Sequence, residues 1–135
     1  EIEYTFSLLF DDRTISILAY NLETVLAEKI ETVLSRSIAN TRPRDFYDIH
    51  ILYSLRGAEC NPETLLQALE RTANKRGSQK VLRQYQDIIS EIRSSEQLRG
   101  FWKKYQRDFD YAKDISFDDA CDTIQHIMNS MLQNK

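Results

Sequence analysis

The sequence predicts a mainly α-helical protein of the α+β class, in which an N-terminal β-hairpin precedes about six helices. Three glycines and two prolines in 135 residues leave little to interrupt long helices. After residue 20, apolar side chains recur with the period of an amphipathic helix. Before it, apolar and polar side chains alternate, as they do in half-buried strands.

The first half of the chain contains the hairpin and two helices. The hairpin occupies residues 2–18, where alternation occurs on both sides of a turn. Asn21 is a suitable N-cap for a helix that extends to about Arg36. A loop at residues 40–43 then leads into a second helix, which carries Asp45.

The second half contains a bundle of about four helices. Asn61 and Pro62 form a cap followed by proline at the first helical position, and this helix should stop at Gly77. One amphipathic pattern then continues from Ser78 to Ile92. Two further helices begin at the serine caps Ser95 and Ser116.

The first helix carries charges within its apolar side. At about 100° per residue, Lys29 falls in the middle of the apolar stripe, and Glu23 and Arg36 also fall on it. Glu28 and Glu31 fall on the opposite side, which we expect to be solvated. An unpaired charge that faces a core is unfavourable, so the three charges on the stripe need partners or a ligand.

The second helix carries charges of the opposite sign. Asp45 and Asp48 are three residues apart, share one face and should be half-buried. Together with Lys29 they form either a buried ion-pair network or a site for a polyanion and a metal. In the first case Lys29 pairs with one of the acids and only locks the two helices together.

Other charged and aromatic groups have structural explanations. Arg71, Lys75 and Arg76 end a helix, where cations favour the helix dipole, and this suffices unless they face the cleft at Lys29. Trp102 and Tyr105 have the spacing of core residues, with base stacking as the alternative.

Composition limits the classes of function. The net charge of -3 argues against a general nucleic-acid-binding surface. The two cysteines are far apart and lack a nearby histidine cluster, so free thiols are expected. No apolar run is long enough to cross a bilayer, so we expect a cytoplasmic protein that does not bind membranes.

The amino-acid sequence of the first two predicted helices resembles that of a known family. Tyr-x-Leu-Glu-Thr-x-Leu-Ala-Glu-Lys starts at Tyr20, and Arg-x-Arg-Asp-Phe-Tyr-Asp-Ile starts at Arg42. Both segments are similar to the AbiEii/AbiGii toxins, nucleotidyltransferase-fold toxins of bacterial abortive-infection, type IV toxin–antitoxin systems. The family's Glu-Lys motif then falls on Glu28 and Lys29, and its Asp-x-x-Asp motif on Asp45 and Asp48.

The resemblance implies transfer of a nucleotide from a nucleoside triphosphate, such as GTP, to an acceptor such as RNA in phage defence. Lys29, Arg42 and Arg44 would bind the nucleotide. Asp45 and Asp48 would orient the acceptor hydroxyl or act as base. The supporting residues would be Glu23, Glu28 and Arg36.

One family motif is missing from this chain. The family has a Gly-Ser pair followed by Asp-x-Asp, whose carboxylates hold Mg²⁺, whereas Gly77-Ser78 and Asp108-Phe109-Asp110 lie far apart in helical patterns. We therefore expect the C-terminal part of such a toxin, with residues 1–58 from the transferase core and 59–135 as a helical bundle. Alone it should be inactive and should bind neither Mg²⁺ nor nucleotide well. The alternative is a non-catalytic helical module that binds a partner such as the antitoxin.

Overall fold

The computed structural model describes residues 21–132, and within them the secondary structure is helical. The α-helices are α3 (Leu22–Arg36), α4 (Pro43–Arg56), α5 (Pro62–Arg76), α6 (Gln79–Arg83), α7 (Tyr85–Ser94), α8 (Glu96–Asp108) and α9 (Phe117–Leu132). The 3-10 turns are η1 (Ser37–Ala39), η2 (Gly57–Glu59) and η3 (Asp110–Ala112). The hairpin expected at residues 2–18 lies outside the described residues.

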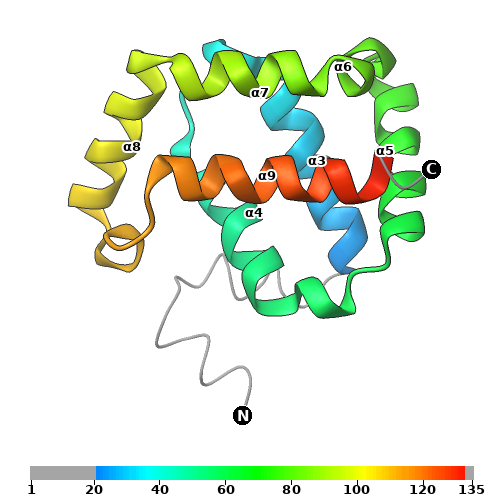
Figure 1. The fold of residues 1–135 in the computed structure, drawn as a ribbon, viewed down its shortest axis with the longest axis horizontal. Helices are drawn as coiled ribbons and strands as arrows, with labels where there is room; N and C mark the ends of the chain where they lie inside the picture. Colours follow the sequence, from blue (N-terminus) through cyan, green and yellow to red (C-terminus); the bar gives the residue numbers. More distant parts are fainter. Residues whose placement is uncertain (1–20, 133–135) are drawn as a thin grey trace.

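Two helices organise the packing (Figure 1). α9 crosses in front of α3 and packs on α4, α5 and α7. α3 packs on α4, α5 and α6, while α8 lies at one side of the molecule and contacts α4. Buried apolar side chains from all seven of these helices form one continuous core. Across residues 21–132, no helix combines the length and the apolar character that a membrane span requires.

Most helix boundaries are those that the sequence predicts. Asn21 and Asn61 cap α3 and α5, because each side chain accepts a backbone hydrogen bond at 3.0 Å. Gly77 ends α5 in the left-handed conformation, with φ of 72°, which glycine adopts without steric cost. Ser95 accepts from the backbone of α8 at 3.2 Å, and Ser116 accepts from that of α9 at 2.9 Å.

The single helix expected from Ser78 to Ile92 is wrong. α6 ends at Arg83 and α7 begins at Tyr85, because Gln84 leaves the helical conformation with φ of -101° and ψ of 16°. Neither glycine nor proline marks this break. Both parts contact α3, but α6 also packs on α5, whereas α7 packs mainly on α9 and η1.

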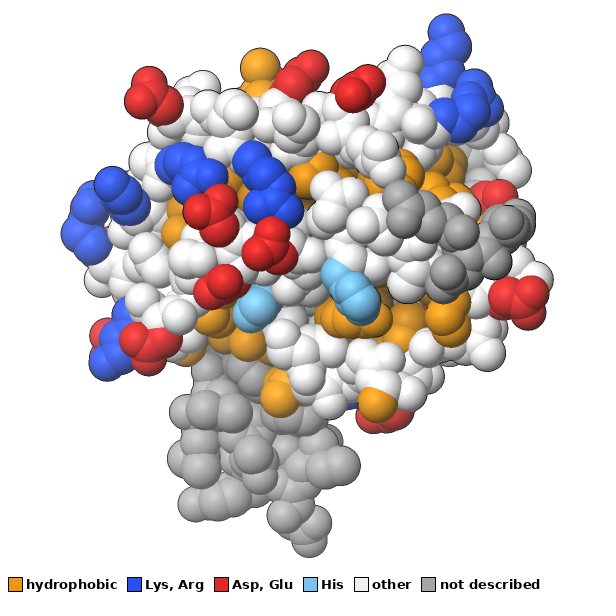
Figure 2. All heavy atoms as spheres, in the orientation of Figure 1, with side chains coloured by type: hydrophobic (Ala, Val, Ile, Leu, Met, Phe, Trp, Pro, Cys, Tyr) orange, Lys and Arg blue, Asp and Glu red, His pale blue; other side chains and the backbone are white. Residues whose placement is uncertain are grey.

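The face shown in Figure 2 mixes basic and acidic side chains. The aromatic residues Trp102 and Tyr105 of α8 belong to the core, as expected. Trp102 and Tyr105 are buried, and the Trp102 Nε1–H group donates to the Ile115 carbonyl oxygen at 2.9 Å.

Candidate functional site

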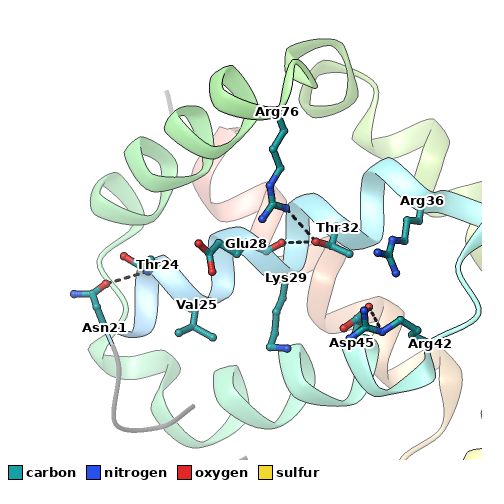
Figure 3. Close-up of a pocket in the computed structure, with 10 residues that line it drawn as sticks. All are labelled: Asn21, Thr24, Val25, Glu28, Lys29, Thr32, Arg36, Arg42, Asp45 and Arg76. Atoms are coloured by element: carbon teal, nitrogen blue, oxygen red, sulfur yellow. Dashed lines mark hydrogen bonds and ion pairs between the residues drawn. The ribbon is translucent and has the colours of Figure 1, made fainter. Parts of the chain in front are cut away.

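An open pocket of about 550 Å³ lies along α3, beside the start of α4 and the end of α5 (Figure 3). Four cations and two carboxylates line it, and two of the cations, Lys29 and Arg76, pair with buried carboxylates that lie outside the lining. The cations are Lys29, Arg36, Arg42 and Arg76, the carboxylates are Glu28 and Asp45, and the other lining residues are Asn21, Thr24, Val25 and Thr32.

Lys29 connects α3 to α4 at the pocket. Its Nζ atom lies 2.8 Å from Asp48 Oδ2, which confirms that the lysine of the first helix pairs with an acid of the second. Asp48 is completely buried and does not line the pocket, so it is more enclosed than the half-buried position expected of it. Asp48 therefore lies behind Lys29 and fixes the position of the ammonium group.

Asp45 has a different environment from Asp48. It lines the pocket and is 3% exposed, yet its buried Oδ2 atom makes no hydrogen bond within the described part of the chain. The same Oδ2 atom lies 3.9 Å from Arg42 Nε, a weak ion pair. Because Asp45 is in the first turn of α4, the helix dipole favours its negative charge.

The turn before α4 explains why Arg42 reaches the pocket. The buried Asn40 side chain accepts a hydrogen bond from the Arg42 backbone N–H at 2.8 Å, which fixes the turn. Pro43 then begins the helix. Arg44, two residues after Arg42, is directed elsewhere: its guanidinium carbon lies 5.7 Å from the centroid of the Phe109 ring. The structure thus brings Lys29 and Arg42 to the pocket but does not bring Arg44 there.

The three supporting residues have separate environments. Glu23 is buried, and its Oε2 atom accepts the backbone N–H of Asn61 at 2.9 Å, so it holds the start of α5 against α3. Glu28 is exposed at the pocket. Arg36 also lines the pocket and is exposed, so its expected position facing the core is wrong. The reason is that the edge of the apolar stripe, at Val25 and Arg36, lines the pocket.

The solvated position expected of Glu31 is also wrong. Glu31 is buried because α5 and α6 cover the side of α3 that the helical period leaves to solvent. Its Oε1 atom accepts from Arg76 Nη1, and its Oε2 atom accepts from Ser35 Oγ at 2.7 Å and from Ser78 Oγ at 2.9 Å. Burial alone would raise the pKa of Glu31, but these hydrogen bonds and the charge of Arg76 lower it.

Arg76 lines the pocket, although the sequence accounts for its charge only by its position at the end of a helix. It is adjacent to Gly77, so attraction to the helix dipole was a sufficient account of its charge. The structure instead places it with Lys29 in the pocket lining. The sequence predicts this position only as an exception, in case the cations at the end of this helix face the cleft at Lys29.

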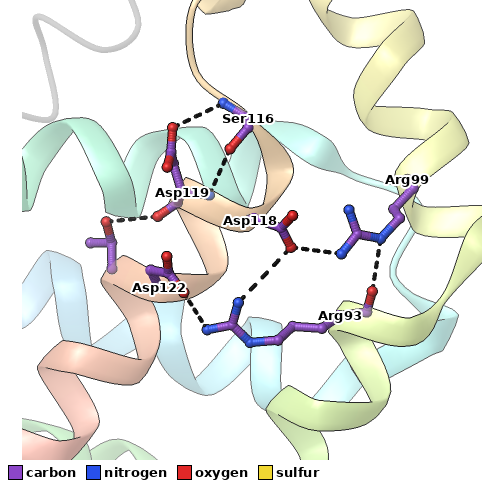
Figure 4. A network of polar contacts seen from close by, with 7 residues as sticks. Arg93, Arg99, Ser116, Asp118, Asp119 and Asp122 are labelled. Carbon is purple, nitrogen blue, oxygen red and sulfur yellow. Dashed lines mark hydrogen bonds and ion pairs between the residues drawn. The ribbon is translucent and has the colours of Figure 1, made fainter.

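A second charged cluster joins α7, α8 and α9 (Figure 4). Arg93 Nη2 lies 2.6 Å from Asp122 Oδ1, and Arg99 Nη2 lies 2.7 Å from Asp118 Oδ1. The hydrogen bond and charge of Arg99 lower the pKa of Asp118. These groups neutralise one another at the surface, where such pairs contribute little to stability.

The fold and the pocket define a helical protein with a cationic pocket along its first described helix. The sequence model of the family described as nucleotidyl transferase AbiEii toxin, type IV toxin–antitoxin system, matches residues 1–123. The chain belongs to this family. Searches among curated proteins and among solved structures give no significant match.

Proposed function

We propose that this chain contributes the nucleotide-binding pocket of a toxin that transfers a nucleotide from a nucleoside triphosphate, such as GTP, to an acceptor. An RNA hydroxyl is the acceptor that we favour, and phage defence is the biological role. One observation carries the proposal. Lys29 and Asp45, whose buried Oδ2 atom makes no hydrogen bond, line the same pocket, in a chain that belongs to a nucleotidyltransferase family.

Lys29 is suited to neutralise triphosphate oxygens. Transfer to or from a phosphate depends on positioning and on charge neutralisation more than on covalent chemistry by the protein. The ion pair with Asp48 holds the lysine in place, yet its side chain stays 16% exposed whereas that of Asp48 is fully buried. Arg42 is 57% exposed and offers forked donors for further phosphate oxygens.

Asp45 is the residue that we assign to the acceptor hydroxyl. Its Oδ2 atom makes no hydrogen bond and pairs only weakly with Arg42. This atom would accept a hydrogen bond from that hydroxyl once the side chain turns into the pocket, and would take its proton as the oxygen attacks the α-phosphorus. A bond then forms between the acceptor oxygen and phosphorus, while the bond to the bridging oxygen breaks and pyrophosphate leaves with its electron pair. Asp48 is buried behind Lys29, so we assign it a positioning role.

The Mg²⁺ ion that the family implies does not fit the described residues alone. Within residues 21–132 no group of three or more histidine, cysteine, aspartate or glutamate side chains is arranged to hold a metal. Asp45 is the buried carboxylate among the described lining residues, and it would supply only part of the usual Mg²⁺ ligand set of one or two carboxylates, substrate phosphate oxygens and water. The steps assigned above therefore use protein side chains only.

The alternative function is a non-catalytic helical module that binds a partner such as the antitoxin. It accounts for the Lys29–Asp48 pair as a lock between α3 and α4. It gives no reason for the missing hydrogen bond at Asp45 Oδ2 or for Arg36 and Arg42 along the pocket. An antitoxin contact is compatible with either function.

A transfer assay with matched variants distinguishes the two functions. The full-length protein would be tested for transfer of a labelled nucleotide from GTP to bulk RNA. Lys29→Gln and Asp45→Asn should each reduce transfer by a factor on the order of 100 or more and should relieve growth inhibition. Lys75→Gln is the control, because Lys75 is exposed and lies outside the pocket lining. Unchanged transfer by a folded Lys29→Gln variant would contradict the proposal.

A further inference from the structure

Arg76 enters the pocket from a helix that carries neither family motif. It is the last residue of α5, and Figure 3 shows its side chain extending from α5 toward Thr32 of α3. Lys29 extends from α3 toward α4 in the same view. The pocket thus receives cations from α3, from α5 and from the turn before α4, a distribution that suits an extended polyanion better than a single small anion.

A buried carboxylate fixes the position of this arginine. The Glu31 side chain is 4% exposed and bonds to Arg76 through Oε1. Its other oxygen is occupied by Ser35 and Ser78, so the carboxylate cannot turn away from Arg76 without breaking two hydrogen bonds. Arg76 is therefore held in place before any ligand binds, which reduces the entropy lost on binding.

The guanidinium of Arg76 keeps donors for a ligand. Its Nη1 group donates one hydrogen bond to Glu31 Oε1 and another to Thr32 Oγ1 at 3.2 Å. Its Nε and Nη2 groups have no partner within residues 21–132, and its side chain is 44% exposed at the pocket. Such a forked edge matches the geometry of a phosphate or a carboxylate, and phosphate is the one that a nucleoside triphosphate supplies.

We propose that Arg76 is a triphosphate-binding residue and that Glu31 is the residue that positions it. This inference rests on the proposed function, since it names a further contact to the same ligand. Arg76 would bind phosphate oxygens on the α5 side of the pocket, while Lys29 and Arg42 would bind them on the α4 side. The structural alternative is that Arg76 only neutralises the buried charge of Glu31.

The test measures the affinity of the full-length protein for GTP and for inorganic tripolyphosphate by calorimetry. Arg76→Gln should weaken both by about tenfold or more, the usual effect of losing a hydrogen bond to a charged group. Arg76→Lys, which keeps the charge but loses the fork, should recover part of this loss. Lys75→Gln, which removes a charge from the exposed side of the same helix, should bind like the unaltered protein.

A double variant separates binding from folding. Glu31→Gln combined with Arg76→Gln removes both charges, so it should regain the thermal stability lost in Arg76→Gln while triphosphate affinity stays low. Recovery of affinity together with stability would overturn the inference, as would affinity within about twofold of the unaltered protein in Arg76→Gln. If Lys29→Gln loses affinity while Arg76→Gln does not, only this inference fails. If the unaltered protein binds neither ligand, the proposed function fails with it.

Discussion

Lys29 and Asp48 form an ion pair of which only the lysine reaches the surface. The Nζ and Oδ2 atoms are 2.8 Å apart, and the side chains are 16% and 0% exposed. The pair therefore has two separable properties, a buried charge that must be balanced and an ammonium group that faces the pocket.

The buried charge should have a large effect on stability. Asp48→Asn leaves Lys29 without its counter-charge in a mostly buried position, so we expect the free energy of unfolding to fall by about 3–5 kcal/mol, measured by urea denaturation. Lys29→Met combined with Asp48→Leu removes both charges and should regain most of that stability without regaining nucleotide transfer. Transfer by this double variant would show that the pair serves packing alone.

The contact between Glu23 and Asn61 should stabilise the junction of α3 and α5. Glu23 accepts the backbone N–H of the residue that caps α5, at 2.9 Å. Glu23→Ala removes the acceptor from this part-buried hydrogen bond, so the free energy of unfolding should fall by about 1 kcal/mol. Glu23→Gln keeps an oxygen acceptor and should lose less. Equal losses in urea denaturation of the two variants would mean that the charge, not the hydrogen bond, matters at this position.

His50 should make stability depend on pH in the weakly acidic range. Burial lowers its pKa from the ordinary value of 6.5, and this outweighs the opposite effect of Asp119. Its Nδ1 atom lies 2.7 Å from Thr123 Oγ1, a contact between α4 and α9. The unfolded chain then binds the proton more readily, so the contribution of His50 is present above pH 6.5 and is lost as the pH falls below it.

The measurement for His50 is an NMR titration of its ring, in parallel with urea denaturation of His50→Gln. The midpoint should lie below 6.5, and the variant should lose less stability than the unaltered protein between neutral pH and the His50 midpoint. A midpoint at or above 6.5 would contradict the effect of burial.

The sequence predicts those features of the fold that depend on neighbouring residues. The caps at Asn21, Asn61 and Ser95 and the left-handed Gly77 depend on neighbouring residues only, so helix boundaries follow from the sequence. The position of Lys29 opposite an acid also follows, because the helical period places both charges on sides that face each other.

Features that depend on distant segments could not be predicted in the same way. A helical period locates one apolar side, but α3 is covered by α4 on one side and by α5 and α6 on another, which buries Glu31. Arg44 turns toward Phe109, more than sixty residues later in the sequence, and Gln84 breaks a helix without a local signal. The division at residue 58 and the roles of Lys29 and Asp45 stay predictions.

Mapping of GTP binding by NMR tests the central claim most directly. Backbone amide shifts of the full-length protein would be followed as GTP is added in the presence of Mg²⁺. We expect the largest changes along residues 24–36 and 42–45, with smaller changes near Asp118 and Asp122, and loss of these changes in Lys29→Gln. Changes that cluster on α8 and α9, or that persist unaltered in Lys29→Gln, would contradict the assignment of this pocket as the nucleotide site.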